Sequence, residues 1–482
     1  MDTPISLALI DGRWCEAASG RRRAVRNPAT DALVAEVAWC DAEDAARAVA
    51  AAATAFAAWS RLPGFERSIL MRRLFELMIR DQDRLAALMT AEQGKPLAEA
   101  RGEVRYAAGF IEWSAEEAKR VTGEVVQAFT PDKRMLVLRQ PIGVTAAITP
   151  WNFPSSMITR KLGPALAAGC TMVVKPASAT PLSALAIGEL AVEAGFPPGV
   201  VNIVVGQSGA IADTLLADPR VRAVSFTGST EVGKELMRKA ADHVTRIELE
   251  LGGHAPFIVF DDADLDAAVE GAIASKFRNA GQTCVCANRI YVQDAVYDEF
   301  SRRLVAATSA LRVGNGADAG VDVGPLVNDE AVAKVEEQVR DAVARGAAVL
   351  TGGSRRLMGA GVPDRFYAPT ILGDVDDSML IYSEETFGPA APLIRFTTET
   401  DAVRMANDSP YGLAAYFFTN DASRLFRVAE QLEYGIVGAN DALPSSPQAP
   451  FGGMKESGLG REGGKWGLDL FLETKYVSVG IR

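Results

Sequence analysis

The fold class is indicated most clearly by residues 143–205, which read GVTAAITPWNFPSSMITRKLGPALAAGCTMVVKPASATPLSALAIGELAVEAGFPPGVVNIVV. Short apolar runs at 143–149, 171–175 and 201–205 alternate with stretches of helical composition, and VRAVSFTG at 221–228 continues the alternation. Strands joined through helices in this way lie parallel, with right-handed crossovers. The pattern therefore predicts a mostly parallel sheet with helices on both faces.

The neighbouring segments extend this plan in both directions. Residues 41–120 are rich in Ala, Leu, Glu and Arg at helical spacing and predict a helical layer, interrupted by turn signals such as Gly94-Lys95-Pro96. A second series of apolar and helical runs, from 257 to about 435, predicts another α/β domain. Residues 121–140 predict a hairpin or a pair of extended arms, and the β-like end 471–482 is expected to pair with them or with another subunit.

Length and composition exclude several classes of protein. A chain of 482 residues favours two or more domains, and 48% hydrophobic residues with a net charge of −11 indicate a soluble globular protein. No basic run exceeds Arg21–Arg23, so no nucleic-acid partner is expected. The longest uncharged stretch, 140–159, contains three prolines, and the N-terminus lacks a basic region before an apolar block. We therefore expect no membrane segment and a cytoplasmic location.

Histidine and cysteine are too scarce for several kinds of catalytic centre. The two histidines, His243 and His254, leave too few ligands or bases for a histidine-rich metal site or a Ser-His-Asp triad. The five cysteines form no C-x-x-C pair, which excludes a zinc ribbon, and their odd number does not fit a disulfide framework. No metal is predicted, and a lone reactive thiol stays possible.

Two glycine-rich strings are candidates for a phosphate site. GLGREG at 458–463 matches the dinucleotide fingerprint, but the chain ends too soon afterwards for the required helix, strand and acidic residue, so a loop is favoured. FTGSTEVG at 226–233 lies between a predicted strand and a predicted helix, where backbone amides would meet a pyrophosphate. Helix capping is the alternative explanation for its Ser and Thr.

Cys284 and Glu250 are the candidates for nucleophile and base. Cys284 follows a predicted helix in NAGQTCVCANR (279–289), where small polar neighbours favour an accessible loop over a buried structural cysteine. Glu250 lies in IELELGG (247–253), and its adjoining glycines allow a ligand to approach. Glu248 has the same strand parity and is expected to be an exposed strand residue.

Taken together, seven blocks resemble the aldehyde dehydrogenase superfamily in type, order and spacing. They are PWNFP (150–154), VVKPAS (173–178), FTGSTEVG (226–233), LELGG (249–253), GQTC (281–284), EETFGP (384–389) and PFGGMKESGLGRE (450–462). Within that family the chain is most similar to the succinate-semialdehyde dehydrogenases. The resemblance spans essentially the whole chain.

The resemblance implies an α/β fold with three parts. A Rossmann-type cofactor-binding domain would comprise 1–120 and 141–252, and an α/β catalytic domain would comprise 253–455. A β oligomerisation arm would comprise 121–140 and 456–482, and the chain would form a homodimer or a homotetramer.

The implied chemistry uses a thiol, an amide and a carboxylate. Cys284 would attack the aldehyde carbon, and the Asn152 side-chain amide would hold the oxyanion together with the Cys284 backbone N–H. Glu250 would activate the water that hydrolyses the thioester. There are two alternatives. The chain could be a catalytically inactive protein with the same fold, or an enzyme that transfers the acyl group of the thioester to coenzyme A. The presence of Cys284, Glu250 and Asn152 argues against an inactive protein, and the presence of Glu250 argues against transfer to coenzyme A.

The cofactor-binding residues implied by the resemblance are Lys175 at the adenosine ribose, Ser229 at the pyrophosphate turn, Glu385 at the nicotinamide ribose, Phe387 beside the ring, and Trp151 and Gly228 along the same path. Many NAD-preferring relatives carry glutamate where this chain has Ser178. We therefore expect NADP to be accepted and preferred over NAD. The alternative is that Ser178 is only a small helix-cap residue and that a nearby loop determines the preference between NADP and NAD.

The substrate implied by the resemblance is a short semialdehyde with a distal carboxylate. Arg160, Arg278 and Ser445 would hold that carboxylate, a task suited to guanidinium groups. The sequence pattern alone predicts that Arg160 and Arg278 are solvent-exposed helix residues. Succinate semialdehyde is the expected substrate, and glutarate semialdehyde or a broader range of aldehydes stays open.

Two further residues are left with open roles. Cys286 could form a reversible disulfide with Cys284 or could be a packing residue, and the two readings have equal weight. His254 stands where the family commonly has asparagine, and its ring is expected to pack near the end of the strand that carries Glu250.

Overall fold

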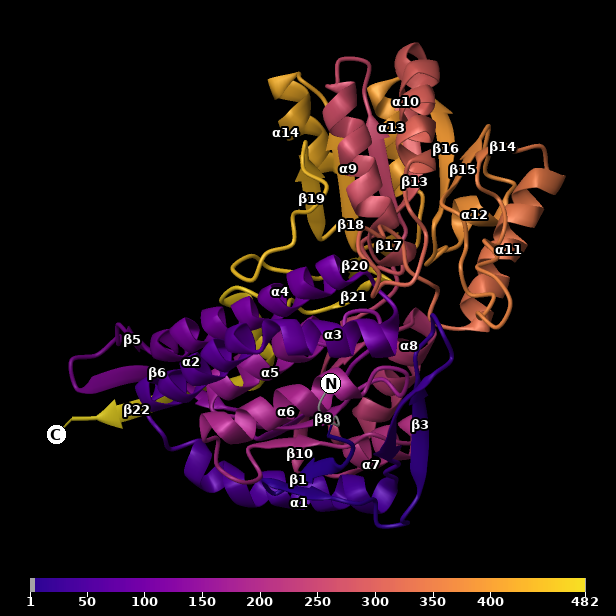
Figure 1. Cartoon of the computed structure of the whole chain (residues 1–482). Helices are drawn as coiled ribbons and strands as arrows, with labels where there is room; N and C mark the ends of the chain where they lie inside the picture. Colours follow the sequence, from indigo (N-terminus) through magenta and orange to yellow (C-terminus); the bar gives the residue numbers. More distant parts are fainter. Residues whose placement is uncertain (1–4, 482) are drawn as a thin grey trace.

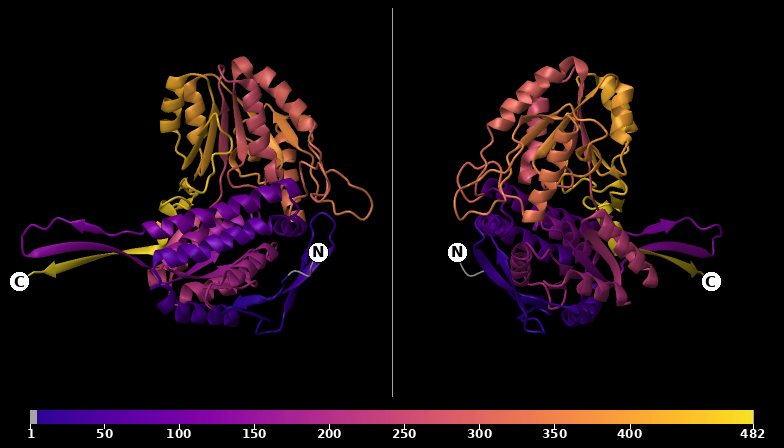
Figure 2. Two further views of the ribbon diagram at one scale, coloured as in Figure 1. Left: turned by 60° about the vertical axis from the view of Figure 1, so that its left-hand side comes forward. Right: turned by 90° about the vertical axis from the view of Figure 1, so that its right-hand side faces the viewer.

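In the computed structural model, which describes residues 5–481, two layered α/β bodies meet along one side and a β arm projects from the first (Figures 1 and 2). The first body contains a sheet of order β2-β1-β9-β8-β7-β10-β11-β21. Its strands are β1 (Ala8–Ile10), β2 (Arg13–Cys15), β7 (Val144–Ile148), β8 (Thr171–Lys175), β9 (Val201–Ile203), β10 (Val221–Thr227), β11 (Arg246–Glu250) and β21 (Gly458–Leu459). The five from β9 to β11 are mutually parallel, which confirms the prediction.

Helices cover both faces of this first sheet. Its helices are α1 (Ala42–Trp59), α2 (Gly64–Arg80), α3 (Gln82–Gln93), α4 (Leu97–Glu117), α5 (Ser156–Ala168), α6 (Leu182–Ala194), α7 (Ser208–Ala217) and α8 (Thr230–Ala240). Met172 and Val174 of β8 pack among residues of α2 to α6, whereas Val173 packs among those of α1, α7 and α8. Because side chains alternate along a strand, β8 contributes to two separate cores.

The second body has a sheet of order β14-β15-β16-β13-β12-β18-β19, parallel except for the β14–β15 pair. Its strands are β12 (Ala255–Val259), β13 (Ala287–Gln293), β14 (Ala348–Thr351), β15 (Thr370–Gly373), β16 (Ala390–Phe396), β18 (Ala414–Phe418) and β19 (Ile436–Ala439). Its helices are α9 (Leu265–Phe277), α10 (Tyr297–Ser309), α11 (Asp329–Ala344), α12 (Leu380–Ser383), α13 (Glu399–Asn407) and α14 (Ala422–Gln431). The second α/β domain expected from the sequence is thus present.

The arm is a three-stranded sheet of β5 (Glu124–Val126), β6 (Lys133–Pro141) and β22 (Leu472–Gly480). Strand β22 pairs antiparallel with β6 along its whole length, which confirms the expected pairing of the C-terminal strand. Residues 456–471 do not lie in the arm: β21 pairs with β11, and the 3₁₀ helix η5 (Trp466–Phe471) packs on α5. Two small pairs complete the topology, β3 (Arg22–Arg26) with β4 (Leu33–Ala38) and β17 (Tyr411–Gly412) with β20 (Met454–Lys455).

Candidate active site

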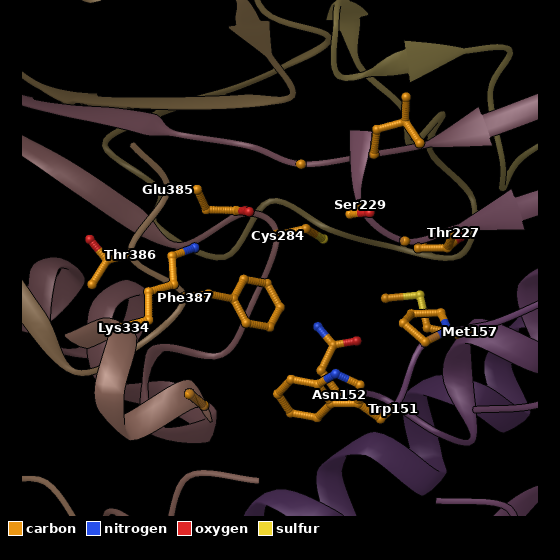
Figure 3. A pocket seen from close by; sticks show the side chains of 15 residues that line it. Trp151, Asn152, Met157, Thr227, Ser229, Cys284, Lys334, Glu385, Thr386 and Phe387 are labelled. Carbon is orange, nitrogen blue, oxygen red and sulfur yellow. The ribbon is translucent and has the colours of Figure 1, made fainter. Parts of the chain in front are cut away.

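Two cavities meet at Cys284, where the first body faces the second. One has a volume of about 270 Å³ and is lined by Trp151, Gly228, Ser229, Glu385 and Phe387 among others. Figure 3 shows Cys284 within this group, with Glu385 and Phe387 on one side of it and Thr227 and Ser229 on the other. The second cavity has a volume of about 320 Å³. Because Cys284 lines both cavities, a ligand in either one can reach its sulfur.

A tight turn presents Cys284 at this junction. The 3₁₀ helix η3 (Arg278–Gly281) ends α9, and Asn279 and Ala280 within it have positive φ values of 52° and 55°. Few residues other than glycine adopt this left-handed conformation, and such strain often accompanies a functional site. Cys284 is half-buried as expected for an accessible loop. Burial raises the pKa of its thiol to about 12, and the nearby charge of Arg160 opposes that rise.

Asn152 lines the first cavity beside Cys284. Its side-chain Nδ2 donates a hydrogen bond to the carbonyl oxygen of Gln282 at 3.0 Å. An amide nitrogen carries two hydrogens, so one N–H stays available to an oxyanion in the cavity. The segment that holds the thiol and the segment that holds the amide are therefore joined directly.

Glu250 ends β11 and is buried, and within residues 5–481 neither of its carboxylate oxygens has a hydrogen-bond partner. A Cβ atom on Gly452 would lie 2.7 Å from Glu250 Oε1, so glycine leaves this carboxylate its space. Desolvation, and then the negative charge of Glu462, raise the pKa of Glu250 well above its ordinary value. A buried carboxylate with a raised pKa is suited to act as a base near neutral pH.

The expectation that Glu248 is exposed is wrong. Glu248 is buried, and its carboxylate accepts a hydrogen bond from the Ser225 hydroxyl at 3.0 Å. The segment that follows β21 covers its side chain: a Cβ on Gly460 would lie 2.8 Å from the Glu248 Cγ, and the local pattern does not reveal this distant contact. Burial raises the pKa of Glu248 to about 8.

The second cavity gathers the three residues expected to hold a distal carboxylate, Arg160, Arg278 and Ser445. Arg160 is not solvated as its pattern alone suggested: it is 2% exposed, and its guanidinium carbon lies 3.7 Å from the centre of the Phe451 ring. The guanidinium of Arg278 lies over the Phe153 ring at 5.5 Å. Two cations that are held by aromatic rings beside a cavity are suited to bind an anion.

Glu462 was missed by sequence reasoning as a separate member of the site. It is buried, forms an ion pair with Arg160 at 2.7 Å, and accepts a hydrogen bond from Lys161. Lys161 in turn donates to the Thr227 hydroxyl at 2.7 Å, and Thr227 lines the first cavity. The only signal for Glu462 in the sequence was that it is a charged residue inside the glycine-rich block 450–462.

Five of the expected cofactor residues surround the first cavity. The Trp151 and Phe387 rings lie edge to face with their centres 5.6 Å apart, and Glu385 accepts a hydrogen bond from the Gly253 amide at 3.0 Å. Ser229 caps α8 by accepting from the Val232 amide at 3.4 Å. The capping alternative is therefore correct for Ser229. The same helix N-terminus, beside Gly228 at the cavity, remains suited to a phosphate.

Lys175 and Ser178 lie at the end of β8, outside the residues that line the two cavities. Lys175 is buried and its Nζ donates to the Ser208 hydroxyl at 2.6 Å, and no carboxylate of residues 5–481 forms an ion pair with it. Burial, with a smaller effect of the Arg23 charge, lowers the pKa of Lys175 to about 8. A buried cation without an acidic partner fits an anionic or hydroxyl-bearing cofactor at this edge of the sheet.

His254 and Cys286 both face the interior of the second body. His254 is buried and donates from Nε2 to the Tyr382 carbonyl at 2.8 Å, and burial lowers its pKa well below the ordinary value. Cys286 is fully buried, with its sulfur 3.6 Å from the Lys276 carbonyl oxygen. These contacts favour the packing role for Cys286.

Within residues 5–481, no helix is long and apolar enough to cross a membrane. In the same residues no three His, Cys, Asp or Glu side chains are grouped to hold a metal ion.

Residues 14–477 match the sequence model of the Aldehyde dehydrogenase family. The chain is 56% identical to a glutarate-semialdehyde dehydrogenase of Pseudomonas aeruginosa, over 98% of this chain and 97% of that protein. It is also 56% identical to a succinate-semialdehyde dehydrogenase of Escherichia coli whose name specifies NADP(+), over 98% of each. A crystal structure described as an E. coli NADP-dependent enzyme superposes with a TM-score of 0.98 at 56% identity, covering 100% of this chain and 99% of that one.

Proposed function

The chain belongs to the aldehyde dehydrogenase family, and we propose that it oxidises a short semialdehyde with a distal carboxylate, using NADP or NAD as the oxidant. Succinate semialdehyde is the expected substrate and glutarate semialdehyde the second candidate. One observation carries the proposal: Cys284 lies where a cavity that contains Arg160 and Arg278 meets the cavity that is lined by five of the expected cofactor residues.

The first half of the proposed reaction forms a thioester on Cys284. The thiolate adds to the aldehyde carbon, and the resulting oxyanion accepts hydrogen bonds from Asn152 Nδ2 and from the Cys284 backbone N–H. The two arginines hold the distal carboxylate and so orient the aldehyde toward the sulfur. A bound nicotinamide supplies the acceptor for the hydride that leaves the same carbon.

The second half releases the product. Glu250 removes a proton from a water molecule as the water attacks the thioester carbonyl, and the carbon–sulfur bond breaks to give the carboxylic acid and the Cys284 thiolate. Glu250 is suited to this step because its carboxylate has no hydrogen-bond partner in the described residues that would compete for the proton. Transfer of the acyl group to coenzyme A would not need this residue.

The experiment that tests the function is a panel of aldehydes assayed with NADP and with NAD by absorbance at 340 nm. Succinate semialdehyde and glutarate semialdehyde represent the carboxylated class, and butanal and pentanal are their uncharged counterparts of equal chain length. We expect kcat/KM to be higher for the carboxylated member of each pair. No oxidation of any aldehyde, or a preference for butanal, would refute the proposal.

Arg278→Ala should raise KM for succinate semialdehyde by roughly 10- to 100-fold, because a charged hydrogen bond contributes about 1.5–3 kcal/mol. The KM for butanal should change by less than about twofold, since butanal has no carboxylate to lose. Steady-state kinetics with both aldehydes measure this difference. Arg105→Ala, on the exposed side of α4, is the matched control and should change neither value. Equal increases of KM for both aldehydes would contradict the assigned role of Arg278.

Wild-type protein should have a higher kcat/KM with NADP than with NAD, and Ser178→Glu should reverse this preference. Ser178 lies within 3.5 Å of the Gly206 carbonyl, close to the buried Lys175 at the same strand end. A glutamate there would repel a 2′-phosphate, and like charges brought together cost several kcal/mol, so we expect the NADP:NAD ratio to fall by roughly 100-fold or more. Ser178→Gln, of similar size without charge, is the control. A wild type that clearly prefers NAD would overturn this assignment.

We also propose that the arm joins copies of the chain into a homodimer or a homotetramer. Apolar side chains such as Val125, Phe129 and Tyr476 are exposed on its three strands and the connecting turn. An exposed sheet with apolar side chains favours association with another chain. A cytoplasmic location stays a prediction.

A further inference from the structure

The turn Gly94-Lys95-Pro96 between α3 and α4 contains a buried lysine that the proposed reaction does not use. Lys95 is 2% exposed and lines the cavity that contains Arg160 and Arg278. Its Nζ donates to a Glu103 carboxylate oxygen at 2.5 Å and to the backbone carbonyl oxygen of Asn152 at 2.8 Å. The amino group also lies 4.1 Å from the centre of the Phe153 ring. Lys95 therefore contacts the segment that carries the proposed oxyanion donor.

Two donors hold the carbonyl group of Asn152. Lys95 Nζ is one, and Asn279 Nδ2, at 2.9 Å, is the other. Asn279 Nδ2 also donates to the Gln282 carbonyl at 3.2 Å, and this carbonyl accepts the hydrogen bond from Asn152 Nδ2. The backbone and the side chain of Asn152 are thus both tied to the turn that precedes Cys284.

Three further side chains from 93–103 fix the same two segments. Glu103 accepts from the Ser155 and Ser156 amides at 2.9 and 3.2 Å, at the start of α5. Glu99 accepts from the Asn279 backbone amide at 2.8 Å, and Gln93 donates to the Asn279 side-chain oxygen at 2.8 Å. This set of four side chains, Gln93, Lys95, Glu99 and Glu103, is called the α3–α4 clamp below.

Stability of the fold alone does not account for the charged pair in the clamp. Removing a lysine and a glutamate from water costs several kcal/mol per ion, and apolar replacements of similar volume are often neutral or stabilising. Both members of the pair instead bind the segment that carries Asn152. Lys95 donates to the Asn152 carbonyl, and Glu103 accepts from the Ser155 and Ser156 amides. A donor displaced by about 1 Å stabilises a transition state far less well.

We propose that Lys95, paired with Glu103, is a positioning residue that aims the Asn152 amide at the oxyanion. Lys95 acts through Asn152 and does not touch the reacting atoms. Its loss should therefore lower the rate of the chemical step more than it weakens substrate binding. This inference rests on the proposed aldehyde oxidation.

A double-mutant cycle between Lys95→Met and Asn152→Ala tests the inference. In the wild-type background, Lys95→Met should lower kcat with succinate semialdehyde by roughly 10- to 100-fold, with KM changed by less than about threefold, because an oxyanion donor contributes about 10²–10³ to kcat. In the Asn152→Ala background the same change should lower kcat by less than about twofold. Lys119→Met is the matched control, since Lys119 forms a comparable pair with Glu116 at 2.7 Å on the surface, and it should leave kcat unchanged.

Effects that multiply in the double variant would overturn the inference, because Lys95 would then act independently of Asn152. An unchanged kcat in Lys95→Met would overturn it as well. Glu103→Gln keeps the size of the side chain and provides a second cycle with Asn152→Ala, for which the same lack of additivity is expected. If both variants fail to fold, the pair serves stability and the inference is wrong. An active wild type with multiplying effects refutes the inference alone, whereas an inactive wild type refutes the proposed function with it.

Discussion

Replacing Cys284 with serine should reduce kcat for semialdehyde oxidation by roughly 10⁴- to 10⁶-fold, the scale seen when the nucleophile of a covalent enzyme is removed. Cys284 is the residue at which both cavities meet, so its sulfur can attack the substrate while the same carbon faces the cofactor. A serine hydroxyl ionises far less readily than a thiol and is the weaker nucleophile. Reduced cofactor formed over the course of a single turnover and in the steady state, followed at 340 nm, measures the loss.

Cys286→Ser is the matched control for this replacement. Cys286 lies two residues away, and its buried sulfur contacts the Lys276 carbonyl, outside both cavities. We expect this variant to keep most of the wild-type kcat. Binding of NADPH by Cys284→Ser, measured by fluorescence, shows that the variant is folded. A Cys284→Ser protein within tenfold of the wild-type kcat would contradict the assigned role of the thiol.

Glu250→Gln should lower steady-state turnover by about 10²–10⁴-fold while the first turnover persists, since this is the range of a general base. The variant can still form the thioester on Cys284 but lacks the base that activates water. Rapid mixing of enzyme with substrate and cofactor should therefore give a burst of about one reduced cofactor per active site, followed by a slow phase. Loss of the burst together with turnover would place Glu250 in the first half of the reaction instead.

The same residue predicts how turnover depends on pH when hydrolysis is the slow step. A general base works only when it is deprotonated, so kcat should rise as the pH increases through the pKa of Glu250. Burial and the charge of Glu462 raise that pKa well above its ordinary value, and the rise in kcat should therefore occur at a correspondingly high pH. It should disappear in Glu250→Gln. Glu248→Gln removes a second buried carboxylate of β11 whose charge also raises the pKa of Glu250, so the rise in kcat should persist in this variant but move to a lower pH.

Much of the architecture could be predicted because it follows from local patterns. The alternation of apolar and helical runs predicts the strands and the crossover helices to within a few residues of their bounds in the structure, as for β7, α5 and β8. The pairing of β22 with β6 was one of the two expected pairings, since the last strand has no partner nearby in the sequence and the β-rich segment 121–140 can offer it an edge. Motif context also singled out Cys284 and Glu250, the candidates for the nucleophile and the base.

The burial of charged residues could not be predicted, because it depends on distant partners. Helix α5 is buried at every position, between the sheet, α4 and η5, so Arg160 has no solvated face to occupy. Its compensating charge is Glu462, which lies some 300 residues further along the chain. Glu248 and Lys95 illustrate the same difficulty. The strand that carries Glu248 and the turn that carries Lys95 were both predicted correctly. Neither pattern reveals which distant segments bury these two side chains.

The return of residues 456–471 to the first body has a consequence for folding. Strand β21 pairs with the strand that carries Glu250 and follows it by roughly 200 residues, and Glu462 follows its partner Arg160 by roughly 300. The first body therefore combines segments that are far apart in the sequence, and such long-range contacts are slow to form because the intervening chain must first be brought together. Until residues 456–471 have docked, the main sheet lacks β21 and the buried Arg160 lacks the partner Glu462. The surroundings of Glu250 and Arg160 are thus complete only once both distant segments have come together.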